Sequence, residues 1–160
     1  MEAADVWKIV LGAVVGLAVS LIAQWSSLAY QTRRQREARR ADFQRSTLIQ
    51  LRDLLIELSE ARQAVAAARY QAKVETGDLY LLGPLHPSVQ AVRTIGDRLN
   101  VVAAAADNLS LRMEIVFVTL HASGAAMSST SSEEAEHEQQ MSEGFRKATQ
   151  LLGDDLRRLA

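Results

Sequence analysis

The sequence predicts an all-α protein whose first helix crosses a membrane, and three observations support this prediction. A long stretch without a charged residue runs from Ile9 to Tyr30. Beyond position 46, apolar residues recur at alternating spacings of three and four, which is typical of packed helices. The chain has only 2 Pro and 3 Phe but is rich in Ala, Leu and Arg, a composition that favours helices over sheet. We therefore predict a transmembrane helix that continues into a long helix, followed by a cytoplasmic antiparallel helical hairpin and a third, C-terminal helix.

The uncharged stretch over 9–30 has the length of a membrane span. About 20 apolar residues rising ~1.5 Å each cover the hydrocarbon core of a bilayer. The alternative is a cleaved secretory signal, for which Ser27 to Ala29 offers small residues, but residues 1–8 lack the positive charge of a signal peptide and the apolar run is too long. We expect residues 1–8 to be external and one small-residue face to pack two spans together. That face consists of Gly12, Gly16 and Ser20.

A basic segment follows directly over 31–45. It contains six arginines and two acidic residues, for a local net charge of +4. Lys and Arg beside a span stay cytoplasmic, so we expect an inner-membrane protein with its N-terminus outside and its C-terminus in the cytoplasm. The arginines of this juxtamembrane helix would contact anionic lipid headgroups. Nucleic acid is the weaker alternative, because only Phe43 offers a ring for stacking. The predicted headgroup ligands are Arg33, Arg34, Arg36, Arg39 and Arg40.

The region 46–122 is predicted to form the helical hairpin. Its first helix carries an apolar packing stripe, and the chain then breaks over Thr76 to Ser88, a loop with two Gly and two Pro. This loop is apolar, so it either folds back over the helix ends or docks a partner. The second helix begins near Pro87, where His86 could cap it. The stripe consists of Leu51, Leu54, Leu58, Ala61 and Val65.

The run 109–120 fits two patterns. Its apolar residues alternate as in a strand, yet Leu109, Met113, Val116 and Leu120 also share one helical face. We choose helix, with a kink near Asn108, because a lone strand would have no pairing partner.

A Ser-rich linker is predicted over 123–132, and a last helix over 133–160. Ser131 and Glu134 have the spacing of a capping box at the start of that helix. Acidic residues near its beginning and Arg157 with Arg158 near its end suit the helix dipole. Whether this helix packs within its own chain or on a neighbouring chain stays open.

Residues able to do chemistry are few. Cysteine is absent, which removes thiolate nucleophiles and zinc–cysteine clusters. Glu134 to His137 matches Glu-x-x-His, an element of di-metal helical bundles, but no second copy is present and a solvated helix start is the better interpretation. No phosphate loop, dinucleotide fingerprint or nucleophile elbow occurs. We therefore predict no catalytic residue, no metal ligand, no cofactor and no enzymatic activity.

The layout resembles the KilB-like proteins of Streptomyces and its plasmids, and other actinobacterial and actinophage single-pass membrane proteins. Trp7, the glycines of the span, the "RRQREARR" segment and the break over Gly83 to Pro87 carry this resemblance, which covers roughly residues 5 to 110. It is a likeness of organisation, and it implies a role in plasmid or phage biology at the membrane.

The predicted function is a non-enzymatic single-pass membrane protein with a cytoplasmic helical interaction module that forms a homo-oligomer, such as a phage- or plasmid-related scaffold. Its partners would be the lipid bilayer, a second copy of the chain and an unidentified protein. The alternative is a membrane-active effector, holin-like or toxin-like, that assembles through its transmembrane helix.

Overall fold

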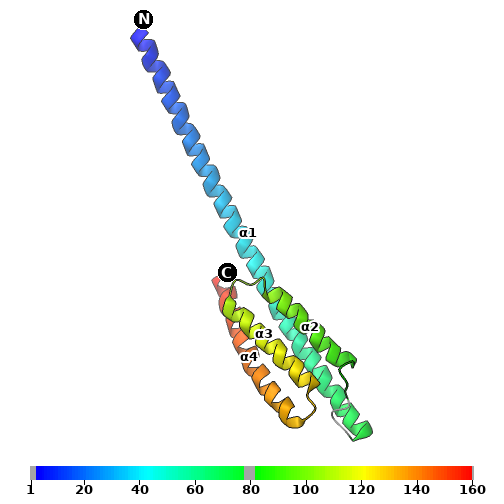
Figure 1. Cartoon of the computed structure of the whole chain (residues 1–160). Coiled ribbons are helices and arrows are strands. Elements are labelled where there is room, and N and C mark those ends of the chain that lie inside the picture. Colours follow the sequence, from blue (N-terminus) through cyan, green and yellow to red (C-terminus); the bar gives the residue numbers. More distant parts are fainter. Residues whose placement is uncertain (1–2, 78–81, 160) are drawn as a thin grey trace. The chain divides into compact units, whose positions relative to one another are not determined.

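The computed structural model describes the chain except residues 1–2, 78–81 and 160, and it describes no side chain at 3–15, 17–19, 22–23, 26 and 29. The described residues form four helices: α1 (Ala3–Thr76), α2 (Pro87–Ala103), α3 (Leu109–Met127) and α4 (Ser131–Arg158) (Figure 1). No strand occurs in the described part of the chain. The predicted all-α class is therefore confirmed.

The chain divides into two units, Met1–Asp42 and Phe43–Ala160. The first unit consists of the N-terminal part of α1. The second contains the rest of α1 together with α2, α3 and α4. The packed helices and the hydrophobic core described below belong to the second unit.

The membrane prediction needs correction. Among the residues that could be assessed, no helix is both long enough and apolar enough to cross a membrane. The predicted transmembrane helix over 9–30 and the localisation in the inner membrane, with the N-terminus outside and the C-terminus in the cytoplasm, are thus contradicted.

The second unit is a four-helix bundle in which consecutive helices run antiparallel (Figure 1). Arg98 of α2 pairs with Glu57 of α1 at 3.1 Å. The hydroxyl of Thr119 in α3 donates to the amide oxygen of Asn100 in α2 at 3.2 Å. Two further ion pairs join α4 to α3 and to α1, so each helix contacts the next in the chain and α4 also contacts α1.

The core of the bundle is built from apolar stripes of all four helices. The side chains of Leu51, Val65, Leu99, Leu111 and Ile115 are fully buried, at 0% exposure. All five members of the stripe predicted for the first helix lie in this core: Leu51, Leu54, Leu58, Ala61 and Val65. These side chains pack against α2, α3 and α4 of the same chain, where they contribute to folding by removing apolar surface from water.

Side-chain caps set the helix boundaries. Nδ1 of His86 accepts a hydrogen bond from the backbone N–H of Ser88 at the start of α2. Asn108 accepts from the N–H of Leu111 and is the N-cap of a separate helix, so the chain breaks where a kink was expected. Thr130, in extended backbone, accepts from the N–H of Glu133 and caps α4, one residue before the predicted cap.

Candidate functional site

Helix α3 is apolar on two opposite faces. The inner face, with Leu111, Ile115, Val118 and Ala122, is fully buried in the bundle. The opposite face also carries large apolar side chains, and these are exposed. We call this exposed set the outer stripe; it consists of Leu109 (63% exposed), Met113 (62%), Val116 (48%), Leu120 (64%) and Met127 (57%).

The outer stripe has the spacing of a coiled-coil seam. From Leu109 to Leu120 its members alternate by four, three and four positions, and Met127 follows Leu120 by seven. Ser123 fills the intermediate position of that last step. A strip of this spacing faces a partner helix in coiled coils, and monomeric proteins rarely expose a large contiguous apolar patch. The outer stripe is therefore the strongest candidate for an interaction surface.

A groove between α2 and α3 lies beside the outer stripe. Its volume is about 210 Å³, and Val116 and Leu120 form part of its α3 wall. The α2 wall is polar and includes the exposed side chains of Arg93 and Asp97. An apolar strip flanked by charges of both signs can bury its centre in an interface and keep a hydrated rim.

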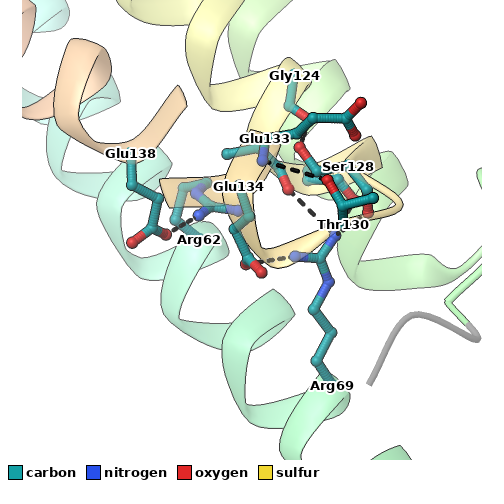
Figure 2. Close-up of polar contacts among 10 residues, drawn as sticks. Arg62, Arg69, Gly124, Ser128, Thr130, Glu133, Glu134 and Glu138 are labelled. Carbon is teal, nitrogen blue, oxygen red and sulfur yellow. Dashed lines mark hydrogen bonds and ion pairs between the residues drawn. The ribbon is translucent and has the colours of Figure 1, made fainter. Parts of the chain in front are cut away.

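A second feature is a pair of buried arginines in α1, which we call the arginine layer (Figure 2). Arg62 and Arg69 are only 5% and 3% exposed, and seven residues separate them, so they share one face of α1. Arg62 pairs with Glu138 and Arg69 with Glu134, both in α4. The layer thus joins α1 to the first half of α4 through charge-assisted hydrogen bonds.

Arg69 also binds the end of α3. Its Nη2 donates to the carbonyl oxygens of Ala125 at 3.1 Å, Ala126 at 2.9 Å and Ser128 at 3.3 Å. The last carbonyls of a helix lack partners within the helix, and a cation there is also favoured by the helix dipole. One side chain of α1 therefore satisfies the C-terminus of α3 and holds the turn into α4 (Figure 2).

The sequence interpretation missed the arginine layer. Neither Arg62 nor Arg69 is among the site residues predicted from the sequence. The available signal was two arginines seven positions apart, one within the predicted packing stripe and one just beyond its last member, Val65. The same pattern fits arginines whose charged ends extend into water. Only the partners on other helices show that these two arginines are buried in ion pairs instead.

A histidine pair lies between α3 and α4. The Nδ1 atoms of His121 and His137 are 3.0 Å apart, and the ring of Phe117 lies 4.3 Å from that of His121, between centroids. Gly124 makes room for this pair, because a Cβ there would come within 2.7 Å of the His137 ring. No group of three or more metal-ligating side chains occurs among the residues that the structure describes.

The pKa of His121 is lowered, chiefly by burial and next by the electrostatic effect of His137, against a smaller raising effect of Glu136. Near the ordinary histidine pKa of ~6.5, the unfolded chain therefore binds more protons than the folded protein. The free energy of unfolding has the full contribution of His121 above that pH, and this contribution is lost as the pH falls below it. We expect His121→Gln to flatten the fall in free energy of unfolding between about pH 7 and 5.

Urea unfolding at several pH values would measure this effect. Ile56→Ala, which changes an exposed side chain without a titratable group, is the control and should leave the slope as it is in the unmodified protein. An identical pH slope for His121→Gln and the unmodified protein would contradict the prediction.

The arginines of the basic segment are exposed on α1 within the first unit. Arg33 pairs with Glu37 at 3.3 Å, and the guanidinium of Arg34 lies 4.9 Å from the centre of the Tyr30 ring. Arg36, Arg39 and Arg40 are exposed as well. Of the predicted span-packing face, Gly16 and Ser20 are exposed and Gly12 lies outside the described side chains.

No family model matches the chain, and neither a curated protein nor a solved structure matches it. The resemblance to KilB-like proteins therefore stays a prediction.

The structure places the predicted packing stripe and the outer stripe in different environments. The side chains of Leu51 and Leu58 are buried within one chain and cannot contact another chain without unfolding. The outer stripe is exposed and needs no rearrangement to do so. Contact between folded copies therefore cannot use the buried side chains of the predicted packing stripe.

Proposed function

We propose that this chain is a non-enzymatic helical interaction module that self-associates through the outer stripe of α3. The observation that carries the proposal is the exposure of five large apolar side chains at coiled-coil spacing on a helix whose other face is already buried. A helix that is apolar on both faces is expected to bury both.

A second copy of this chain is the occupant that the stripe fits best. A seam with alternating spacings of three and four packs against a helix with the same spacing, and α3 of another copy has it. The stripe itself carries no charged residue, so two copies bring no like charges together at its centre. A two-fold interface uses the same patch on both chains, which is the commonest arrangement in homo-oligomers.

The test is the association state of the full chain. We expect the unmodified protein to dimerise with increasing concentration in analytical ultracentrifugation. Met113→Glu with Leu120→Glu should weaken the dimer at least ~100-fold, since two carboxylates from each chain would have to be buried. Both positions are exposed, so the variant should fold and keep its helical circular dichroism.

Ile56→Glu with Tyr70→Glu is the matched control. These two apolar side chains of α1 are 50% and 68% exposed but lie outside the outer stripe, so the control should dimerise as the unmodified protein does. A protein that stays monomeric at all concentrations, or a stripe variant that dimerises normally, would refute the proposal.

A further inference from the structure

We propose that a groove between α1 and α4 binds a small amphiphilic carboxylate, with the carboxylate on Arg62 and the aliphatic chain along the apolar wall. This site is separate from the outer stripe, and the proposal does not depend on self-association. The argument rests on the shape and lining of the groove and on the state of the Arg62 guanidinium.

The groove has a volume of about 440 Å³, within the roughly 300–1,000 Å³ of small-ligand sites. Its apolar lining includes Leu58 and Ala66 from α1 and Met141 and Phe145 from α4. Sites for small molecules combine such apolar walls with a few polar groups that fix orientation. Arg62 is the buried polar group of this groove.

The Arg62 guanidinium has more N–H donors than acceptor groups around it. Its Nη2 donates to Glu138, but Nε and Nη1 are buried and have no hydrogen-bond partner among the residues that the structure describes. A buried donor without an acceptor is costly, and a guanidinium is suited to bind a carboxylate through two parallel hydrogen bonds. Figure 2 shows the pairing of Arg62 on α1 with Glu138 on α4. The groove therefore contains a cationic group whose hydrogen-bonding capacity is only partly used.

Glu138 is the group that a ligand would displace. Its side chain is 51% exposed, so it can turn into water at little cost, whereas Arg62 is 5% exposed and is fixed. A carboxylate in the place of Glu138 could accept from Nη1 and Nη2 together. Arg146, which is exposed at the same groove, adds a second positive charge. With Glu138 turned away, the groove favours an anion.

The experiment is calorimetric titration of the full chain with decanoate and with decyltrimethylammonium, each below its micelle-forming concentration. The two probes share their aliphatic chain and differ in the sign of the head group. We expect decanoate to bind with a saturable 1:1 stoichiometry and decyltrimethylammonium to bind at least ~10-fold more weakly.

Two variants test the assigned roles. Arg62→Met should weaken decanoate binding at least ~10-fold, because the charged donor is lost. Glu138→Gln should strengthen it by a similar factor, since the competing carboxylate is removed. A purely structural Arg62–Glu138 pair predicts the opposite sign for Glu138→Gln, because the groove would lose order. If Arg62→Met does not fold, Glu138→Gln decides alone.

Glu57→Gln is the matched control. It removes a carboxylate that also pairs with an arginine, Arg98, but on the side of α1 that faces α2. Decanoate binding should be unchanged in this variant. The proposal is overturned by absence of decanoate binding, by equal affinity for both probes, or by weakened binding in Glu138→Gln.

Discussion

Replacing Arg69 with methionine is expected to lower the free energy of unfolding by about 3–5 kcal/mol, the usual cost of removing one partner of a buried ion pair. Arg69 is 3% exposed and donates to Glu134 and to three carbonyls at the end of α3. Methionine has a similar length and no donor, so all four acceptors lose this partner and little volume is lost. Urea unfolding of the full chain, followed by circular dichroism, would measure the change.

The control for this prediction is Arg98→Met. Arg98 also forms an interhelical ion pair, with Glu57, but its side chain is 58% exposed, and exposed pairs contribute ~0–1 kcal/mol. Adding Glu134→Met to Arg69→Met should recover part of the loss, because the unpaired carboxylate is then removed as well. A cost for Arg69→Met no larger than that of Arg98→Met would contradict the role of Arg69 in holding α3 and α4.

Leu51→Ala is expected to cost about 2–5 kcal/mol, the range for large-to-small substitutions in a packed core. The Leu51 side chain is 0% exposed and lies in the cluster formed by all four helices. Ile56→Ala is the control on the same helix; its side chain is 50% exposed, so the cost should stay below ~1 kcal/mol. Urea unfolding would measure both changes.

Leu51→Ala also separates two interpretations of the predicted packing stripe. If the stripe packs within one chain, the loss in stability does not depend on protein concentration. If the stripe joined two chains, Leu51→Ala would mainly weaken the oligomer, because the Leu51 side chain would then be buried by association. Equal effects of Leu51→Ala and Ile56→Ala at all concentrations would contradict the core assignment.

The helical class could be predicted because it depends on local pattern. The spacing from Leu51 to Val65 places every member on one face of a helix, and any compact fold of such a helix must bury that face. The cap at His86 could be predicted for the same reason, since a cap depends on residues next to it in the chain. The choice of helix over 109–120 is confirmed, although the local pattern fitted a strand equally well.

Contacts between distant parts of the chain could not be predicted in this way. In the sequence, Arg69 is one of many charged residues on a helix. Only the packing of the bundle places it next to the backbone carbonyls of Ala125 and Ala126 at the end of α3. Likewise, His121 and His137 lie on different helices, and their rings meet because Gly124 leaves the space. The exposure of Met113 and Leu120 has the same origin: their spacing shows that they share a face, but not which face of α3 is buried.

Local sequence is sufficient to predict that the chain forms helices, which of their faces are apolar, and which residues begin α2. Those properties follow from the period of the helix and from hydrogen bonds between near neighbours. Which apolar faces become core, which stay exposed, and which partners Arg62 and Arg69 have depend on the packing of the bundle. Such choices depend on how helices distant in sequence pack together, because burial and pairing are properties of the whole assembly of helices and not of any one segment.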